Sequence, residues 1–195
     1  KTVDAELAAL LKNLPEPPLP RIERAYDLLV AGVGGTGVVT IGAIVTMAAH
    51  LEGKGASVLD FMGFAQKGGS VLSYVRLGAA PEALNQVRID TGGAQALIAC
   101  DLVVATDERA LAVMQKSRTR AVANIDIMPT ADFIRDRSVD FAARQRVTTL
   151  RDACGDAAVD TIDATQIALG LLGDTVFSNM FLLGFAWQKG LVPVS

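Results

Sequence analysis

The sequence is poor in the residues on which most metal sites and nucleophilic enzymes depend. Its 195 residues include two cysteines, Cys100 and Cys154, and one histidine, His50. Neither cysteine has a partner at ligand spacing, so we expect this chain alone to hold no iron–sulfur cluster and no cysteine-rich zinc site. A single histidine excludes any site that needs two. We therefore expect no catalytic residue and no metal ligand in this chain, and we expect a reducing, cytoplasmic environment.

Charged and aromatic side chains are also scarce. Charged residues make up 20% of the chain and aromatic residues 5%, and the formal net charge is -3. Nucleic acids and anionic membranes are bound through many lysines and arginines, and unpaired bases through aromatic stacking. The composition therefore predicts neither a nucleic acid nor a membrane surface as a partner.

One long uncharged run, Leu28 to Leu51, has the length of a membrane span. Glycines interrupt it repeatedly, and four of them fall between Gly32 and Gly37. Such a cluster is typical of a loop between a buried strand and a buried helix. We therefore expect this run to be part of a globular core.

Proline marks the expected domain boundary. Four of the seven prolines fall between Leu14 and Pro20, which favours an extended connector. A short helical pattern, Ala5 to Leu11, precedes it. We expect residues 1–25 to be the end of a preceding segment with a proline-rich linker, residues 26–195 to be the globular domain, and the chain to be a fragment of a longer one.

Apolar runs then alternate with helical patterns. A strand is predicted at Leu28–Ala31, a helix at Val38–His50 and a strand at Ser57–Phe61, which together form a βαβ unit. Further strands are predicted at Ser70–Leu77, Asp101–Ala105, Arg120–Ile125 and Val159–Ile162, with a helix near Asp107–Lys116. The pattern predicts an α/β fold, a Rossmann-like open sheet that is mostly parallel and has helices on both faces.

The C-terminal part predicts two capped helices. Asp163 is expected to cap a helix that ends at Gly173, and a last helix occupies Asp174–Lys189. That last helix is apolar around nearly its whole circumference, so we expect it to be buried in the core or against a partner. Within it, Ser178 and Asn179 need buried partners, which indicates a packing contact or a subunit seam.

The segment from Gly32 to Gly37 fits the pattern G-x-G-x-x-G between a predicted strand and a predicted helix. Glycines allow a tight turn and let a ligand approach helix N–H groups that favour an anion. Alternatively, they let the helix pack closely against the strand. The candidate ligand-binding residues of this loop are Gly32, Gly34, Gly35, Thr36 and Gly37.

A second glycine-bearing loop follows the strand at Ser57–Phe61. Its candidate ligand-binding residues are Gln66, Lys67, Gly68 and Gly69. If that strand is parallel to the first, both loops leave the same carboxyl edge, where open α/β sheets bind ligands. Thr106–Arg109 and Asn124–Thr130 are expected at this edge as well. A plain hairpin turn remains the other interpretation of the second loop.

Two further functions remain open from the residues alone. A dinucleotide site needs an acidic residue about 20 positions after the glycines, and Asp60 is 23 residues after Gly37. The alternative function is therefore a self-sufficient NAD(P)- or FAD-binding Rossmann domain. A structural dimerisation module, built on the apolar last helix, is the other function that the residues leave open.

Two segments of the chain resemble a known family. The first is LLVAGVGGTGVVTIGAIVTMAAHLEGKGASVLD, and the second is FAQKGGSVLSYVRL. Together with the closing SNMFLLGFAWQKGLVP, they resemble the gamma-type domain of 2-oxoacid:ferredoxin oxidoreductases. The resemblance covers Tyr26 to Ser195, and it is nearest to single-chain enzymes similar to indolepyruvate ferredoxin oxidoreductase.

The resemblance implies a parent enzyme that uses thiamine diphosphate, magnesium and [4Fe–4S] clusters to convert a 2-oxo acid into an acyl-CoA, with ferredoxin as electron acceptor. The cluster and thiamine motifs are missing here, so they belong to other domains or subunits, which are the expected partners, together with a homodimer. This domain is then expected to serve assembly and to form part of the coenzyme A or active-site wall. Backbone amides and Lys67 are the expected anion contacts.

Overall fold

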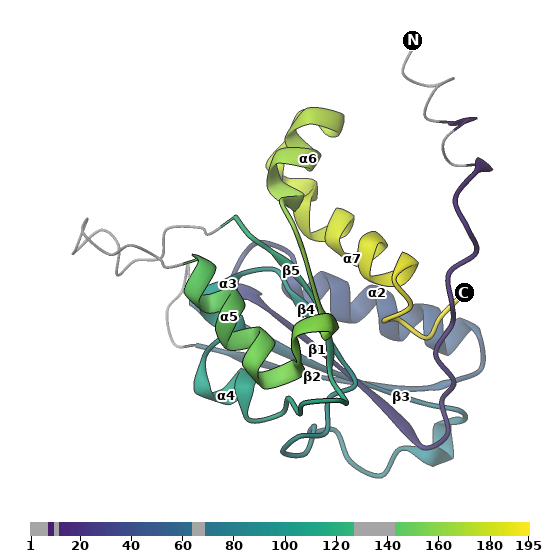
Figure 1. Ribbon diagram of the computed structural model, residues 1–195. Coiled ribbons are helices and arrows are strands. Elements are labelled where there is room, and N and C mark those ends of the chain that lie inside the picture. Colours follow the sequence, from purple (N-terminus) through teal and green to yellow (C-terminus); the bar gives the residue numbers. More distant parts are fainter. Residues whose placement is uncertain (1–7, 10–11, 64–68, 127–142) are drawn as a thin grey trace.

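The computed structural model describes residues 8–9, 12–63, 69–126 and 143–195, and these form a six-stranded mixed sheet. The strands are β1 (Ala25–Val33), β2 (Gly55–Met62), β3 (Ser70–Gly78), β4 (Ala96–Ala99), β5 (Arg120–Asn124) and β6 (Val159–Ile162). Their order is β2-β3-β1-β4-β5-β6. β1, β4, β5 and β6 pair in parallel, whereas β3 is antiparallel to both β1 and β2. β2 therefore runs in the same direction as β1, with β3 between them (Figure 1).

Helices cover both faces of the sheet. One face carries α2 (Val38–Leu51) and α7 (Ser178–Gln188), and the other carries α3 (Leu102–Ala105), α4 (Glu108–Leu111) and α5 (Ala143–Cys154). α6 (Ala164–Leu172) and a short turn, η4 (Thr175–Phe177), lead into α7, while η1 (Pro81–Ala83) and η3 (Asp156–Ala158) are other short turns. The predicted α/β fold, mostly parallel and covered on both faces, is confirmed.

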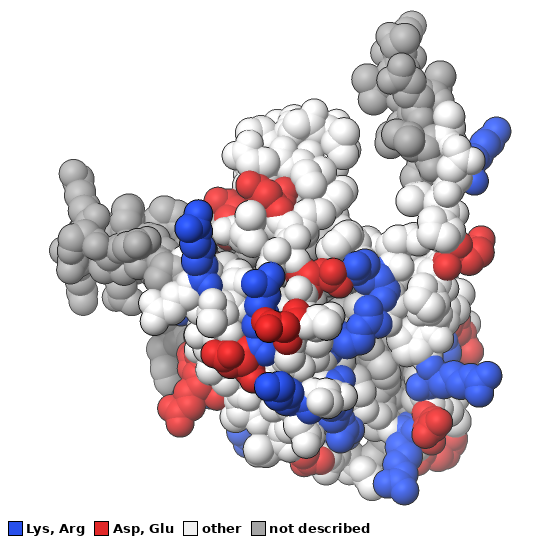
Figure 2. Space-filling view, viewed as in Figure 1, with Lys and Arg blue, Asp and Glu red and all other residues white. Residues whose placement is uncertain are grey.

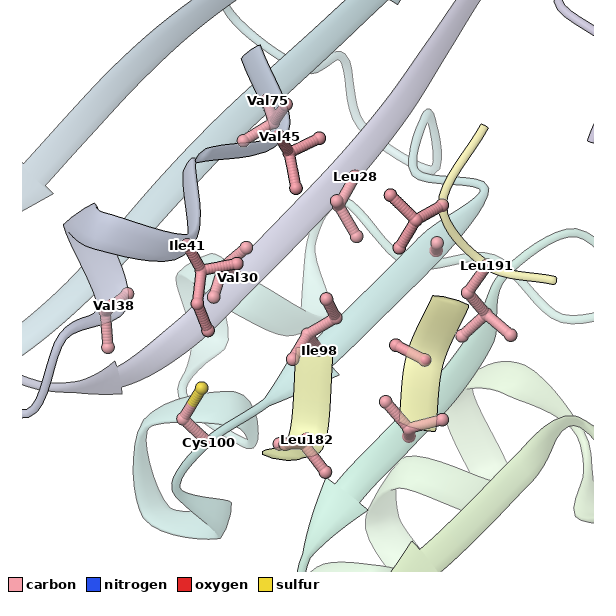
Figure 3. Close-up of a cluster of buried hydrophobic side chains, with 14 of the residues drawn as sticks. Leu28, Val30, Val38, Ile41, Val45, Val75, Ile98, Cys100, Leu182 and Leu191 are labelled. Carbon is pink, nitrogen blue, oxygen red and sulfur yellow. The ribbon is translucent and has the colours of Figure 1, made fainter. Parts of the chain in front are cut away.

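Alternation along β1 builds the two cores. Leu28 and Val30 point to the face of α2 and α7, where they pack with Ile41 and Leu182 (Figure 3). Leu29, like every second residue of the strand, points to the opposite face and its helices. A strand that is buried on both faces has a continuous apolar sequence. For this reason the sequence predicts β1 directly.

One predicted strand is wrong. The sequence predicts a buried strand at Asp101–Ala105, but residues 102–105 form helix α3. The Asp101 carboxylate accepts a hydrogen bond from the backbone N–H of Val104 at 2.9 Å and so caps this helix. The buried strand is β4, which precedes it. The helix predicted near Asp107–Lys116 is shorter than expected, because α4 ends at Leu111.

The C-terminal helices begin and end largely as predicted. Asp163 caps α6 by accepting a hydrogen bond from the Gln166 N–H at 2.9 Å, and α6 ends at Gly173 in a left-handed conformation. Asp174 caps η4, so that α7 itself begins only at Ser178. On the side of α7 that faces the sheet, Leu182 is fully buried.

α6, η4 and the start of α7 leave apolar side chains exposed. The large exposed apolar residues of this region are Leu169, Leu171, Leu172, Val176, Phe177 and Met180. α6 lies at the top of Figure 1, and the same region of Figure 2 is mostly uncharged, whereas charges of both signs are mixed over the rest of that face. The last helix is therefore buried on one side and partly exposed on another.

The uncharged run that begins at Leu28 consists of β1, a loop and α2. Within the part of the chain that the structure describes, no helix is long and apolar enough to cross a membrane. Ahead of β1, residues 15–22 have no helix or strand. The division into a linker and a domain stays a prediction.

A buried ion pair joins the two central antiparallel strands. Asp27 of β1 lies opposite Arg76 of β3, and both residues are less than a tenth exposed. The guanidinium donates from Nε to Oδ1 at 2.7 Å and from Nη2 to Oδ2 at 3.2 Å. It also donates to the carbonyl oxygen of Arg88 at 2.9 Å. Burial raises the pKa of Asp27, and the hydrogen bond and charge of Arg76 oppose that rise.

Replacing Gly42 by alanine is expected to lower the free energy of unfolding by about 1–3 kcal/mol. A Cβ atom there would lie 2.6 Å from Ser73 Oγ and 3.2 Å from Val58 Cγ2, so either the buried Ser73 side chain or α2 has to shift. Gly184 of α7 is the matched control, because a Cβ atom there meets nothing within 4 Å. Gly184→Ala is expected to gain about 0.5–1 kcal/mol, since alanine favours a helix. Urea unfolding of the two variants measures both values, and equal effects would contradict the close contact at Gly42.

Candidate functional site

The Gly32–Gly37 loop lies at the carboxyl edge of the sheet, at the point where the connections diverge. From β1 the chain passes into α2 on one face, and from the neighbouring β4 it passes into α3 on the other. In open α/β sheets this divergence leaves a crevice at the carboxyl ends of the strands, where ligands bind. The loop thus occupies the position that its sequence pattern predicts.

Left-handed glycines shape the loop. Gly35 has a φ of 87° and Gly37 a φ of 95°, and Gly37 is the residue that precedes the first turn of α2. Residues with a Cβ atom rarely adopt this conformation. Between these glycines, Thr36 donates from Oγ1 to the Val33 carbonyl oxygen at 2.7 Å, which closes the turn. The backbone N–H of Thr36 points to the same oxygen, at 3.3 Å.

Gly32 has a packing role. A Cβ atom on it would lie 2.7 Å from Val38 Cγ2 and 2.9 Å from Cys100 Cβ. The close approach of α2 and the end of β4 therefore requires glycine at this position. The packing interpretation of the glycine pattern explains this residue without any ligand.

The first glycine-bearing loop contacts the last residue of the second. The backbone N–H of Gly34 donates to the carbonyl oxygen of Gly69 at 2.8 Å. Because β2 and β3 are antiparallel neighbours, the second loop is also the connection of a β-hairpin. Three of its candidate residues, Gln66, Lys67 and Gly68, lie outside the described residues.

Asn179 of α7 forms hydrogen bonds with the glycine loop at Thr36. Its Nδ2 donates to the Thr36 carbonyl oxygen at 2.6 Å and to Thr36 Oγ1 at 3.0 Å, and the residue is 5% exposed. The sequence marked Asn179 as a buried polar residue that needs a partner, and the structure shows a packing contact. Its partner lies 143 residues earlier in the chain. Sequence reasoning therefore missed Asn179 as a residue of the loop site.

A cavity of about 420 Å³ opens beside the loop, between the ends of β1, β4 and β5 and the connection from α6 to α7. Among its lining residues are Thr36, Asp101, Asn124, Asp126, Asp174 and Asn179. Three of these carry carboxylates, and no lysine or arginine is among the described residues that line the cavity. The described walls thus disfavour an anion within this cavity.

Asn124 joins the end of β5 to the start of α6. Its Nδ2 donates to Thr165 Oγ1 at 3.0 Å, and its Oδ1 accepts a hydrogen bond from the backbone N–H of Ala164 at 3.0 Å. Asn124 therefore lies at the carboxyl edge, as predicted, whereas residues 127–130 lie outside the described residues. Thr106 does not line this cavity, and its Oγ1 accepts a hydrogen bond from Arg146 at 2.7 Å.

A smaller hollow of about 290 Å³ lies on the other side of the loop, over the first turn of α2. It is lined by Gly34, Gly35, Gly37, Val38, Val39, Thr40 and Val71. The first N–H groups of a helix have no partner inside the helix and carry the positive end of its dipole, which favours an anion. Since the N–H groups of Gly34 and Thr36 are already engaged, the start of α2 offers the donors on this side.

The cysteines do not fit a metal or cluster site. Burial raises the pKa of Cys100 to about 12, with Asp101 adding to the rise, and burial raises that of Cys154 to about 11. Both therefore remain thiols at neutral pH and are poor ligands. In the described ranges no group of three histidine, cysteine or acidic side chains is placed to hold a metal ion. These residues fit neither an iron–sulfur cluster nor the metal of bound thiamine diphosphate.

The strand order also disfavours a self-sufficient dinucleotide site. Asp60 lies on β2, and β3 separates β2 from β1. Two inter-strand spacings, about 10 Å in all, therefore separate Asp60 from the glycine-bearing strand. In a dinucleotide fold the acidic residue ends the strand next to the glycine loop, so Asp60 is out of place for a ribose.

Two curated relatives are similar to this chain over most of its length. The pyruvate synthase subunit PorC of Methanothermobacter thermautotrophicus is 28% identical over 84% of this chain and 76% of its own. The indolepyruvate oxidoreductase subunit IorB of the same organism is 28% identical over 83% of this chain and 77% of its own.

Solved structures show the same fold. The PORC subunit of pyruvate oxidoreductase from Thermotoga maritima matches with a TM-score of 0.57 and 16% identity, over 88% of this chain and 80% of that one. The 2-oxoglutarate:ferredoxin oxidoreductase of Magnetococcus marinus, solved with 2-oxoglutarate, coenzyme A and succinyl-CoA bound, matches with a TM-score of 0.52 and 17% identity. That match covers 81% of this chain and 23% of the larger enzyme.

A family model described as pyruvate ferredoxin/flavodoxin oxidoreductase matches residues 27–195, which begin at the third residue of β1 and include the rest of the sheet with its helices. The relatives and the fold agree with it. The chain therefore belongs to the pyruvate ferredoxin/flavodoxin oxidoreductase family, as a gamma-type domain of 2-oxoacid:ferredoxin oxidoreductases.

Proposed function

We propose that this gamma-type domain serves an oxidoreductase that decarboxylates an aryl 2-oxo acid, similar to indolepyruvate, to its acyl-CoA and passes the electrons to ferredoxin. One relative is named for pyruvate and another for indolepyruvate, at equal identity. The aryl choice rests on the resemblance of the two glycine segments to single-chain enzymes similar to indolepyruvate ferredoxin oxidoreductase.

Within such an enzyme the domain would act together with other parts. Thiamine diphosphate, magnesium and the [4Fe–4S] clusters belong to partner domains or subunits, because the described residues here do not fit them. The exposed apolar side chains of α6 and η4 are consistent with a role in assembly. We expect a homodimeric, cytoplasmic assembly.

For this domain's own site, we place a coenzyme A contact at the start of α2. Coenzyme A carries a pyrophosphate, and the N–H groups at the start of α2 and the Lys67 ammonium are the cationic or donor groups that suit it. The observation that carries this placement is the hydrogen bond from Gly34 to Gly69, which joins the first loop to the last residue of the second at one edge of the sheet. The acid-lined cavity on the other side of Thr36 would repel the same group.

The affinity of the assembled oxidoreductase for coenzyme A, measured for the wild type and for Lys67→Ala, tests the placement. Loss of one ammonium contact to a phosphate is expected to weaken binding about tenfold or more. Lys116, an exposed lysine in another part of the chain, provides the control, and Lys116→Ala is expected to bind coenzyme A as the wild type does. Equal affinity of the Lys67→Ala variant would remove Lys67 from the site.

The substrate class is tested separately. In the same enzyme, kcat/KM for indolepyruvate is expected to exceed kcat/KM for pyruvate at least tenfold. A preference for pyruvate would overturn the aryl assignment and leave the coenzyme A contact standing.

A further inference from the structure

A separate cavity of about 560 Å³ lies on the face of the sheet opposite α2, beside α4. Two rings form one wall: Phe61 of β2 and Tyr74 of β3 pack edge to face, with centroids 5.0 Å apart and planes at 62°. Leu72, Ile89, Ala112 and Val113 complete the apolar lining. The volume and the mixture of apolar and polar walls are typical of a pocket for a small organic molecule.

Two guanidinium groups reach the same cavity. Arg88 lies 5.5 Å from the centroid of the Phe61 ring, and Arg109 comes from α4. Neither makes an ion pair with a carboxylate within the described residues. The other charged residue of the lining, Asp90, accepts a hydrogen bond from Gln86 at 2.8 Å. The lining therefore carries a net charge of +1, from two arginines and one aspartate.

Tyr74 links the rings to the charges. It is 4% exposed, and burial raises the pKa of its phenol while the positive charges of Arg88 and Arg109 oppose the rise. Both guanidinium groups thus act on the same phenol, which stays protonated at neutral pH. A protonated phenol beside two cations donates a hydrogen bond to an anionic oxygen.

We infer that this cavity binds a small aromatic monocarboxylate, with its ring against Phe61 and Tyr74 and its carboxylate on Arg88 and Arg109. Guanidinium groups bind carboxylates through paired hydrogen bonds, and aromatic rings favour an edge-to-face or offset neighbour. A single negative charge balances the net +1 of the lining. A nucleotide carries two or more negative charges. The negative charge beyond the first would lie in a cavity that also contains the Asp90 carboxylate, so the monocarboxylate is the better fit.

The inference goes beyond the proposed function and does not depend on it. The cavity lies on the opposite face of the sheet from α2 and shares no lining residue with the hollow at the start of that helix. A ligand here is therefore a second ligand, additional to coenzyme A.

The inference is tested by measuring indole-3-acetate binding in equilibrium dialysis. The sample is the protein purified together with the subunits that accompany it. This probe has the ring and the carboxylate but no 2-oxo group. We expect Arg109→Met and Phe61→Leu each to weaken binding at least tenfold, and Arg88→Met combined with Arg109→Met to abolish it. Arg144, an exposed arginine of α5 away from the cavity, gives the matched control, and Arg144→Met is expected to leave binding unchanged.

Two results would overturn the inference: undiminished indole-3-acetate binding in the double arginine variant, or tighter binding of AMP that is lost in that same variant. Indole without a carboxylate and acetate without a ring are expected to bind far more weakly than the complete probe. Both arginines are exposed, so thermal unfolding of the arginine variants is expected to match the wild type. Turnover of a 2-oxo acid is measured in parallel, which separates a failure here from a failure of the proposed reaction.

Discussion

Asp27→Ala is expected to lower the free energy of unfolding by about 3–5 kcal/mol, the largest loss that we expect from one substitution in this chain. The substitution leaves the Arg76 guanidinium buried between β1 and β3 without its carboxylate. Its remaining hydrogen bond, to the Arg88 carbonyl oxygen, does not neutralise the charge. Urea unfolding, followed by circular dichroism, measures the loss.

The control for this result removes both charges together. Asp27→Leu combined with Arg76→Met keeps the volume apolar, and it is expected to restore most of the stability that Asp27→Ala loses. If the double variant were no more stable than the single one, loss of packing would explain the effect, and the buried charge would not.

Asn179→Leu is expected to raise the KM for coenzyme A about tenfold or more while lowering the free energy of unfolding by about 1–3 kcal/mol. Leucine has a similar size but cannot donate to either oxygen of Thr36. The loop then loses the contact that fixes it over the start of α2. Steady-state kinetics of the assembled oxidoreductase, with coenzyme A varied, gives the KM.

Asn85→Leu is the matched control, because Asn85 is exposed and lies away from the glycine loop. It is expected to change neither the KM for coenzyme A nor the unfolding. A fall in kcat with an unchanged KM in Asn179→Leu would show that the Thr36 contact serves something other than coenzyme A binding.

The parts of the fold that sequence predicted well have strong local signals. β1 and α2 follow from a continuous apolar run broken by glycines, and β6 from a short stretch rich in β-branched residues before an acidic cap. The Asp163 cap lies three residues from its hydrogen-bond partner, Gln166, so the whole motif is visible in one short stretch. Local capping chemistry of this kind survives in the folded chain because it satisfies N–H groups that would otherwise lack partners.

The failures come from signals that are ambiguous or distant. The run after Asp101 is rich in valine, which favours a strand, but its aspartate caps a helix, and the cap prevailed. Nothing in the spacing of the strands reveals that β3 inserts between β1 and β2, which displaces Asp60 from the glycine loop. Asn179 and Thr36 meet only through the tertiary fold, so no local pattern connects them.

For a related reason, the sequence does not predict the cavity at Phe61. In sequence, Arg88 and Arg109 are isolated exposed charges, and only the tertiary fold brings them to one cavity with Phe61 of β2 and Tyr74 of β3. Pairings between distant segments place side chains together without leaving a local periodicity.

Amide hydrogen exchange of the assembled oxidoreductase, with and without coenzyme A, tests the central claim most directly. The claim is that the glycine loop and the start of α2 contact this ligand. We predict slower exchange on coenzyme A addition at residues 35–40, and smaller changes in β6, which lies at the far edge of the sheet. Coenzyme A binding by the enzyme with no change in exchange at residues 35–40 would contradict the claim.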